Sequence, residues 1–334
     1  MAEFDVEVPS QETAWDRFLE ASRPDIGYKQ SSWWADFLAT RGWGHFEVIV
    51  SDAKGILGGA RVLTSSFAPG KCFYYLPEGP VLPAEDERAE QVFEAIMGFI
   101  DQERKQEPDV VSHLRFEPRW AQRPSFIHGC REAEGWLDPR RTLVVDLSLS
   151  ETAILEQMKP KGRYNIRLAR RKAVTVVEDM SPQGVADFLE IYNETFVRHG
   201  MRGHSTRYFQ TLTARLAALD LGSIFFAEFE GIRLATALVV YSGDRATYKY
   251  GGSRQSHRNV MAPYLLHFEA MRRAKDRGHR WYDFYGIAPK DAPQHRWANF
   301  SAFKRKFGGC ELSFVPALDH VFEPDAYQAY RHQE

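Results

Sequence analysis

The stretch Leu234-Ala-Thr-Ala-Leu-Val-Val-Tyr241-Ser-Gly-Asp-Arg-Ala-Thr-Tyr-Lys-Tyr250 decides the fold of this chain. Its first eight residues form an apolar run of strand length. Ser242-Gly243-Asp244 has the composition of a hairpin turn. The return segment, Ala246–Tyr250, alternates, and a regular strand would place Tyr248 and Tyr250 on one face. The stretch therefore predicts a β-hairpin with a tyrosine-bearing second strand.

The residues after this hairpin predict a break, a helix and a further strand. Gly251-Gly252-Ser253 is expected to end the hairpin. Residues 262–277 have apolar side chains at helical spacing and are followed by Gly278, and Trp281–Tyr285 has the length of a short strand. Phe303-Lys-Arg-Lys-Phe-Gly-Gly309 lies on a last helix or loop. Hairpin, break, helix and strand is the core pattern of an N-acyltransferase-like α/β domain, in which the break and helix start face the acyl donor.

The first half of the chain repeats this order. Gly55-Ile-Leu-Gly-Gly-Ala-Arg-Val-Leu63 aligns with the segment that begins at Gly231, 176 positions later, and Tyr74 aligns with Tyr248 at an offset of 174. A helix over 87–106 and a strand over 110–116 follow. We interpret this as an internal duplication, although strand–turn–strand–helix series are common enough to match by chance. The expected fold is α/β (α+β), with two tandem N-acyltransferase-like units, residues 1–140 and 141–334, whose mixed sheets are flanked by helices.

Length, charge and cysteine content limit the functional classes. A chain of 334 residues suits about two domains, and a net charge of −2 gives no global nucleic-acid signature. Three widely spaced cysteines argue against a disulfide framework or zinc site and fit a reducing cytoplasm. The acidic N-terminus does not have the apolar core of a signal peptide, and no apolar run is long enough to span a bilayer. We therefore expect a cytoplasmic protein.

A basic segment near the junction of the two units is the strongest charge feature. Residues 159–172 contain seven Lys or Arg residues and no acid. A helix would bring several of the cations onto one face, where they could hold phosphates of RNA or of a nucleotide-linked substrate. The alternative is a solvated helix face, which is what most charge runs are. The candidate phosphate-binding residues are Lys161, Arg163, Arg167, Arg170 and Arg171.

The start of the helix over 262–277 bears on the acyl donor. A CoA-dependent transferase of this fold holds pyrophosphate on open backbone amides at a helix N-terminus, which requires glycines. In Arg258-Asn-Val-Met-Ala-Pro263, Met261 and Pro263 occupy the glycine positions, and proline lacks an N–H. A CoA donor is therefore disfavoured, and Arg258 becomes a candidate substrate-binding residue.

Four stretches together resemble the FemABX family of peptidoglycan bridge-forming aminoacyltransferases. Each is weak alone, but their order and spacing are specific, and the resemblance covers most of the chain. They are Val144–Leu147 with Lys161-Gly-Arg163 and Ile166–Lys172; Tyr248-Lys-Tyr-Gly-Gly-Ser253; Pro263–Leu266 with Tyr282-Asp-Phe-Tyr-Gly-Ile287; and Phe303-Lys304 with Phe307-Gly308. The chain would be an armless member, because it contains no long heptad segment to form the helical hairpin that many members have.

The resemblance implies transfer of an amino acid from aminoacyl-tRNA to an amine on the stem peptide of a peptidoglycan precursor, either lipid-linked or nucleotide-linked. No cofactor is implied, since aminoacyl-tRNA is a co-substrate, and peripheral contact with the inner face of the membrane is conceivable. The enzyme has to align an activated ester with an amine, remove a proton and stabilise an oxyanion. The oligomeric state is not predicted.

The resemblance also suggests roles for individual residues. Lys304, in the Phe303-Lys304 motif, is the first candidate for stabilising the oxyanion or leaving group; the alternative is a surface lysine. Tyr248 and Tyr250 match tyrosines that line the substrate channel, with strand packing as the alternative. Phe303 joins the substrate-binding set. Glu117 occupies a position where relatives have an acid and is a candidate base, although a salt bridge to Arg115 or Arg119 is the favoured alternative. Asp283 is a candidate acid, with a structural role as the alternative.

Some positions depart from relatives that use a nucleotide-linked precursor. Those relatives have a lysine where this chain has Asp36, and an arginine four residues before the tyrosine that matches Tyr208, where this chain has His204. Arg202 and Arg207 are close enough in sequence to substitute. These departures leave room for a lipid-linked precursor or another amine.

Other chemistries find little support. No two histidines stand three or four residues apart, so no metal site is predicted. Two alternatives to aminoacyl transfer stay open: a CoA-dependent N-acyltransferase that holds its donor without glycines, and a non-catalytic relative that binds cell-wall precursor or RNA.

Overall fold

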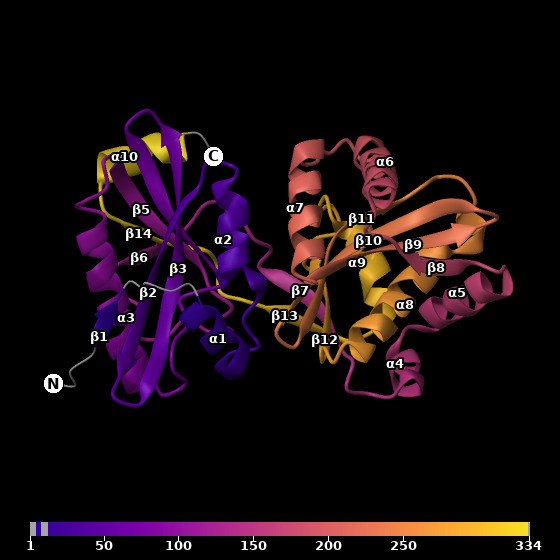
Figure 1. Ribbon diagram of the computed structural model, residues 1–334, viewed down its shortest axis with the longest axis horizontal. Coiled ribbons are helices and arrows are strands. Elements are labelled where there is room, and N and C mark those ends of the chain that lie inside the picture. The colour runs from indigo at the N-terminus through magenta and orange to yellow at the C-terminus, as the bar shows by residue number, and fades with distance from the viewer. Residues whose placement is uncertain (1–4, 8–12, 333–334) are drawn as a thin grey trace. The chain divides into compact units, whose positions relative to one another are not determined.

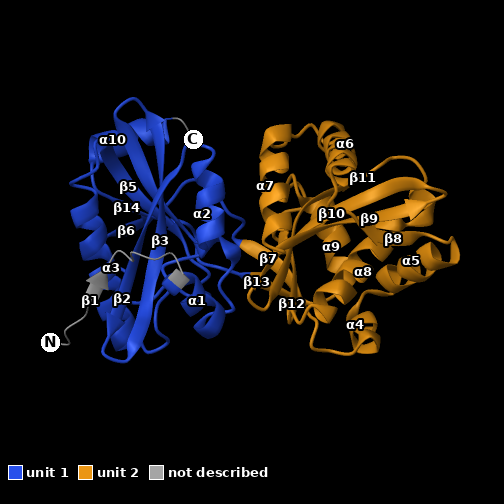
Figure 2. Ribbon diagram, in the orientation of Figure 1, with its two compact units in different colours: residues 1–140, 313–334 blue, residues 141–312 orange. Residues whose placement is uncertain are grey.

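The structure is a computed structural model that describes residues 5–7 and 13–332. The chain forms two compact units, shown in Figure 2. Unit 1 comprises Met1–Arg140 and Ser313–Glu334, and unit 2 comprises Arg141–Leu312. Each unit is a sheet covered by helices (Figure 1).

The sheet of unit 1 is antiparallel except for one parallel pair, β4 with β5. Its strands, in spatial order, are β1 (Asp5–Glu7), β2 (Gly44–Asp52), β3 (Gly55–Ala68), β4 (Lys71–Pro77), β5 (Val110–Glu117), β14 (Leu318–Val321) and β6 (Cys130–Glu132). The parallel pair is connected by α3 (Asp86–Glu103), whose buried face, including Val92, Ile96 and Ile100, packs on the sheet. The other helices are α1 (Thr13–Ser22), η1 (Tyr28–Gln30), α2 (Ser32–Ala39) and α10 (Pro324–Arg331).

The sheet of unit 2 follows the same plan, with its parallel pair at β11 and β12. Its strands, in spatial order, are β13 (Cys310–Ser313), β7 (Arg141–Asp146), β12 (Trp281–Gly286), β11 (Arg245–Ser253), β10 (Ile232–Ser242), β9 (Gly222–Phe229) and β8 (Thr175–Glu178). The helices are α4 (Glu151–Gln157), α5 (Pro160–Arg171), α6 (Pro182–Arg198), α7 (Thr206–Ala218), η2 (Arg258–Val260), α8 (Ala262–Asp276), α9 (Ala298–Lys304) and η3 (Arg305–Phe307).

Small and β-branched residues of β10 lie in the buried cluster that α8 shares with this sheet. Ala235, Ala237 and Val239 alternate along the strand and belong to the same buried cluster as Ala270 and Ala274 of α8. Because alternate strand residues face one side, this cluster defines the face covered by α8. In Figure 1, α6 and α7 lie on the opposite side of the sheet from α8.

The two sheets confirm the predicted fold class of two tandem N-acyltransferase-like units. In both, an antiparallel hairpin leads through a helix into a strand parallel to the second hairpin strand: β3–β4–α3–β5 and β10–β11–α8–β12. Gly55 and Ile232 begin the two first hairpin strands, close to the register of the sequence alignment. The predicted Gly243 turn joins β10 to β11.

The end of the chain differs from the sequence expectation, which placed all of residues 141–334 in one unit. Residues 313–334 belong to unit 1, where β14 pairs with both β5 and β6. A buried ion pair fixes this strand: the Arg115 guanidinium donates to both oxygens of Asp319, at 2.8 and 2.9 Å. The Tyr327 hydroxyl donates to Asp319 as well, at 2.7 Å. These long-range partners leave no local signature in the sequence.

The hairpin strand β11 corrects two further expectations. It does not end at Gly251, because pairing with β10 continues to Ser253 opposite Ala235. A register shift leaves Lys249 as an extra residue, since Tyr250 pairs with Leu238 and Tyr248 pairs with Val239. Neighbouring residues on β10 face opposite sides, so the bulge turns Tyr248 and Tyr250 to opposite faces of the sheet.

Candidate functional site

The candidate site opens where β11 parts from β12. The two strands pair only from Arg245 opposite Trp281 to Thr247 opposite Asp283. Beyond that point β11 stays with β10, and a cavity of about 700 Å³ lies beside its free edge. The cavity is lined from five segments: the end of α6 (Thr195, Arg198, His199), β10 (Leu234, Thr236), the residues from β11 to η2 (Tyr248, 251–259), the start of α8 (261–264, Leu266, His267), and α9 with η3 (Asn299, Phe300, Phe303, Lys306).

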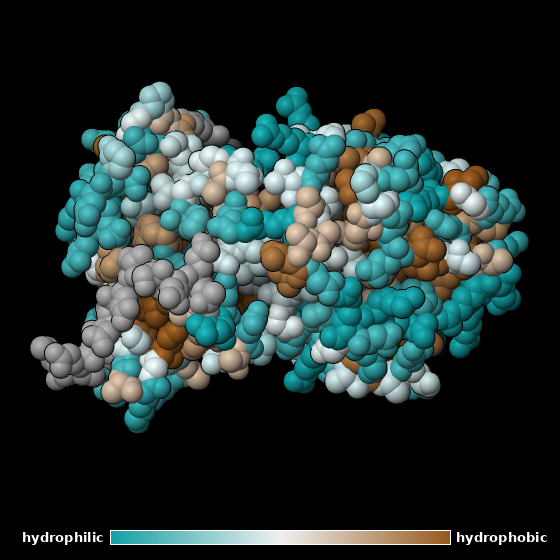
Figure 3. All heavy atoms as spheres, viewed as in Figure 1, coloured by the Kyte–Doolittle hydropathy of each residue, from teal (hydrophilic) through white to brown (hydrophobic). Residues whose placement is uncertain are grey.

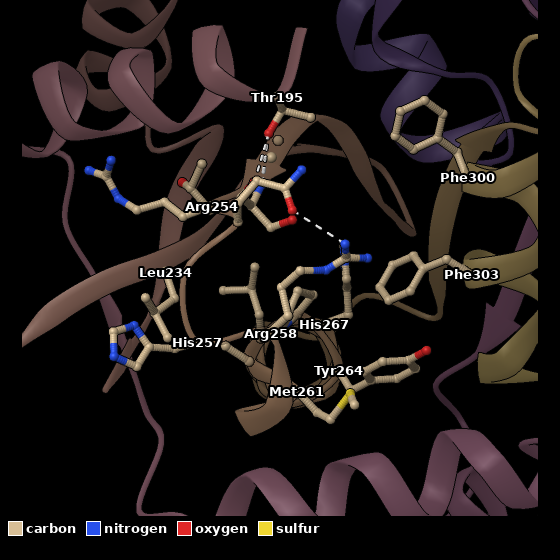
Figure 4. Close-up of a pocket in the computed structure, with 18 of the residues that line it drawn as sticks. Thr195, Leu234, Arg254, His257, Arg258, Met261, Tyr264, His267, Phe300 and Phe303 are labelled. Carbon is tan, nitrogen blue, oxygen red and sulfur yellow. Dashed lines mark hydrogen bonds between the residues drawn. The ribbon is translucent and has the colours of Figure 1, made fainter. Parts of the chain in front are cut away.

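The lining combines apolar walls with positive charge. None of its residues in the described part of the chain is an aspartate or glutamate, whereas Arg198, Arg254, Arg258 and Lys306 are cations. Arg254 is paired with Glu190 at 2.9 Å and Glu194 at 3.3 Å. Arg258 is exposed and donates to the neutral side chain of Gln255, as Figure 4 shows, and Lys306 donates to the Tyr264 hydroxyl at 2.9 Å. The cavity therefore favours an anionic ligand with an apolar part.

Lys304 lies behind the cavity wall, at the end of α9. Its Nζ donates to the Gly286 carbonyl at 2.7 Å and lies 5.7 Å from the ring centroid of Tyr248, which lines the cavity. Burial, opposed by the charge of Asp283, lowers the pKa of Lys304 to about 8. Two residues predicted separately, Lys304 and Tyr248, thus lie close together, and Phe303, the neighbour of Lys304 in its motif, lines the cavity itself.

Sequence reasoning missed His267, which lies on α8 beneath this wall. The imidazole is buried against the rings of Tyr248 and Phe303, at 4.4 and 5.6 Å between centroids, and its Nδ1 lies 3.0 Å from the Tyr282 hydroxyl. Burial, together with the charge of Lys304, lowers the pKa of His267 to about 3, so the ring is neutral at neutral pH. A lone histidine in an apolar helix gives no sequence signal of this position.

Asp283 forms structural contacts. Its carboxylate accepts from Arg245 at 2.9 Å, from the backbone N–H of Tyr285 at 2.7 Å and from the Thr142 hydroxyl. The side chain is buried and ties β12 to β11 and β7 at the point where the strands part. These contacts match the structural alternative for Asp283. Its charge also raises the pKa of Lys304, against the effect of burial.

Tyr208 and Tyr250 meet on the other face of the sheet. Their hydroxyls lie 2.8 Å apart, and the His204 ring stacks on Tyr208 at 4.0 Å. Neither tyrosine lines the cavity described above. Arg202 and Arg207 are exposed beside this cluster in sequence. Five of the seven substrate-binding residues predicted from the sequence therefore divide into two groups, Tyr248 with Phe303 and Arg258, and Tyr250 with Tyr208.

Glu117 ends β5 in unit 1 and holds a loop. It accepts from the Tyr75 hydroxyl at 2.9 Å and from the backbone N–H groups of Leu137 and Asp138 at 2.6 and 2.7 Å. Burial raises the pKa of Glu117 in spite of these hydrogen bonds and the nearby charge of Lys29. Of the salt-bridge partners expected from the sequence, Arg115 pairs with Asp319 and Arg119 with Glu78, and the charge of Arg115 also acts on Glu117.

The basic segment forms α5, and its cations differ in their contacts. Arg163 donates to the carbonyls of Glu156 and Met158, which caps the end of α4, and Arg170 pairs with Glu269 at 2.9 Å. Lys161, Arg167 and Arg171 are exposed. Two of the five predicted phosphate-binding residues therefore have structural partners, and three face solvent.

Two other kinds of feature, a metal-binding cluster and a membrane-spanning helix, are absent from the described residues. No cluster of three or more His, Cys, Asp or Glu side chains within residues 5–7 and 13–332 is arranged to hold a metal ion. In the same residues, no helix combines the length and the apolarity needed to cross a bilayer.

The fold and the cavity define a tandem N-acyltransferase-like protein, and comparison with known proteins specifies the family. The FemAB family matches residues 127–218 and 221–333, more than half of the chain. The chain therefore belongs to the FemAB family.

Relatives of known activity cover nearly the whole chain. UDP-N-acetylmuramoylpentapeptide-lysine N(6)-alanyltransferase of Weissella viridescens is 25% identical over 85% of this chain and 87% of the relative. Lipid II:glycine glycyltransferase of Staphylococcus epidermidis is 23% identical over 93% of this chain and 92% of the relative.

Solved structures agree on the fold. The crystal structure of FemX superposes with a TM-score of 0.88 at 16% identity and covers 97% of this chain and 99% of its own. A tandem GNAT protein from the clavulanic acid biosynthesis pathway superposes with a TM-score of 0.54 at 14% identity, over 95% of this chain and 97% of its own. At these identities the likeness supports the fold alone.

Proposed function

We propose that this FemAB-family protein transfers an amino acid from aminoacyl-tRNA to an amine on the stem peptide of a peptidoglycan precursor. The observation that carries the proposal is the cavity at the parted strands, which has cations, no acid among its described lining residues, and Lys304 against its tyrosine wall. Such a cavity suits the terminal adenosine, phosphate and esterified amino acid of a charged tRNA. Its volume of about 700 Å³ is within the range of small-ligand sites.

The start of α8 supports this donor over CoA. Met261 has a left-handed backbone with φ of 58°, and its side chain reaches the cavity beside Tyr264 (Figure 4). Pro263 has no N–H, and the Tyr264 N–H donates to the Met261 carbonyl at 3.0 Å. Two of the amides that would hold a pyrophosphate at a helix N-terminus are thus unavailable.

The chemistry needs few groups from the protein. The amine nitrogen attacks the ester carbonyl carbon, the C–N bond forms, the C–O bond to the ribose breaks, and the amine proton passes, directly or through water, to the departing ribose oxygen, which is released as a hydroxyl. Negative charge develops on the carbonyl oxygen during this step, and the Lys304 ammonium is the candidate that stabilises it. Its lowered pKa, about 8, still leaves the charged form in the majority at neutral pH.

The names of the relatives support the proposed acceptor class, and the place of action is proposed together with it. One relative is named for a lysine of a UDP-linked muramoylpentapeptide and the other for lipid II, so a precursor amine is the acceptor class we propose. Action in the cytoplasm, with contact at the inner face of the membrane for a lipid-linked acceptor, is part of the same proposal.

The donor decides between aminoacyl transfer and CoA-dependent acylation. Purified protein is incubated with a stem-peptide acceptor and either charged tRNA or acyl-CoA, and products are identified by mass spectrometry. The proposal expects a new amide from charged tRNA, lost when the tRNA is first treated with ribonuclease, and none from acyl-CoA. Product from acyl-CoA that survives ribonuclease contradicts it. Binding of precursor or RNA without product from either donor favours the non-catalytic relative.

A further inference from the structure

The exposed face of α5 presents one aromatic ring among cations. Tyr164 has half of its surface exposed. The Lys161 ammonium lies 5.6 Å and the Arg171 guanidinium 5.9 Å from the centroid of its ring. Lys161, Tyr164, Arg167 and Arg171 follow one another at spacings of three or four residues, so they form one stripe along the helix. In Figure 3 the surface where α5 lies in Figure 1 is coloured mostly hydrophilic.

The contacts of the other cations separate this stripe from the structural part of the helix. Arg163 caps α4 and Arg170 is paired with Glu269, whereas Lys161, Arg167 and Arg171 are exposed and form no ion pair with a carboxylate among the described residues. No acid occurs in residues 159–172. The stripe is therefore an uncompensated positive surface with a flat apolar ring in its middle.

The stripe begins at the rim of the cavity. The Lys159 N–H at the start of α5 donates to the carbonyl of Lys306, a cavity-lining residue, at 3.1 Å. Gly162 packs so closely on the same carbonyl that a Cβ there would lie 2.4 Å from its oxygen. The helix start is thus fixed against the cavity wall, and its 12 residues extend about 18 Å from there.

We infer that α5 is a track for single-stranded RNA, on which Tyr164 stacks an unpaired base that precedes the last two nucleotides of the 3′ end, with Lys161, Arg167 and Arg171 contacting the phosphates of these preceding nucleotides. The inference rests on the proposed function, in which the cavity holds the charged 3′ end. Aromatic rings set in a positive groove are the usual means by which proteins bind single strands, because every base offers a flat face.

The composition of the face favours RNA over a membrane surface. An interfacial membrane helix needs several large apolar side chains on its buried side. Among residues 159–172, Tyr164 is the single large hydrophobic residue that is exposed, and the cations surround it. A single Tyr164 ring among cations suits stacking of one RNA base, with the cations contacting the neighbouring phosphates.

The test compares two donors that differ only in their reach. An aminoacylated tRNA extends over α5, whereas the aminoacylated dinucleotide 5′-phosphocytidyl-adenosine fills the cavity only. Tyr164→Ala is expected to lower kcat/KM about 5- to 100-fold with the tRNA and less than about twofold with the dinucleotide. Tyr164→Phe keeps the ring and is expected to stay near the wild type with both donors. Since Tyr164 is half exposed, both variants are expected to fold.

A direct binding measurement keeps this inference separate from the proposed function. If the wild type transfers from neither charged donor, the proposed function fails, and binding of an uncharged single-stranded RNA to the wild type and Tyr164→Ala still tests the stacking. Weaker RNA binding by Tyr164→Ala supports the inference. Equal loss with both donors, no loss with either, unchanged RNA binding, or a loss confined to anionic phosphatidylglycerol vesicles overturns it.

Discussion

The two units share a topology but open at different places. In unit 1, β4 stays paired with β5 from Lys71 opposite Val110 to Pro77 opposite Glu117. It leaves β3 after Tyr75, and the chain returns to β3 only at Val81 opposite Gly59. In unit 2, β11 stays with β10 to its end and leaves β12 after Thr247. The same hairpin strand therefore parts from its neighbour on opposite sides in the two units.

What fills each gap differs as well. In unit 1 the side chain of Gln30, fully buried, takes the place of backbone pairing. Its amide accepts from the Arg61 N–H at 2.9 Å and donates to the Pro77 carbonyl at 2.6 Å. In unit 2 the gap is left to a cavity with Lys304 behind its wall. One copy of the fold has a buried polar side chain in its gap, and the other has the cavity that we propose for the donor.

The largest expected effect is on the stability of unit 1, when the ion pair between Arg115 and Asp319 of β14 is lost. Asp319→Ala leaves the Arg115 guanidinium buried without its carboxylate, which is expected to lower the free energy of unfolding by about 3–5 kcal/mol. Urea denaturation measures the loss, and hydrogen exchange locates it at β5 and β14. Asp325→Ala, an exposed carboxylate in the same segment, is the control. Equal stability of the two variants contradicts the role of the ion pair in attaching residues 313–334.

The next prediction concerns Lys304, the candidate catalytic residue of unit 2. Lys304→Ala removes the ammonium proposed to stabilise the oxyanion and is expected to lower kcat about 10²–10³-fold. Precursor binding, followed by calorimetry, is expected to be retained. The exposed Lys290→Ala serves as the matched control, because its side chain pairs only with Glu311 among the described residues. Unchanged transfer by Lys304→Ala removes this lysine from the mechanism.

Gln30→Leu tests the side-chain bridge between β3 and β4 in unit 1. It leaves the Arg61 N–H and the Pro77 carbonyl without the partners they have in the native protein, at a cost of about 1–3 kcal/mol for each buried group. Thermal and urea unfolding measure the change. Gln183→Leu, at an exposed glutamine of α6 that donates to Asp187, is expected to stay within about 0.5 kcal/mol of the wild type. A stable Gln30→Leu protein argues that water replaces the side chain in the gap.

A further expected effect is a pH dependence of stability that belongs to unit 2. Burial lowers the pKa of Lys304 from 10.5 to about 8, so between these values the unfolded chain binds more protons than the native protein. Stability contributed by this group therefore rises with pH from about 8 to 10.5 and is constant below. Lys304→Met is expected to flatten this part of the stability curve, measured by urea denaturation at several pH values. Parallel curves for the two proteins contradict the shifted pKa.

Local patterns in the sequence predict much of this protein. Apolar periodicity and the Gly243 turn predict the hairpin, α8 and β12, because these elements depend on neighbouring residues. The repeated Gly-Ile start and tyrosine reveal the duplication, and the charge run marks α5. The family motifs predict Phe303 and Tyr248, which line the cavity, and Lys304, which lies behind its wall beside Tyr248.

Tertiary structure decided what depends on distant partners. The attachment of residues 313–334 to unit 1 rests on Asp319 meeting Arg115, about 200 positions away, which no periodicity encodes. The bulge at Lys249 separates Tyr248 from Tyr250, because strand register is set by pairing across the sheet. The choice of the neighbour from which each hairpin strand parts likewise involves distant partners, since Gln30 bridges Arg61 and Pro77 in unit 1. Local sequence patterns thus predict the helices, the strands and the candidate residues they carry. Long-range packing decides where β11 parts from β12, and so where the cavity lies.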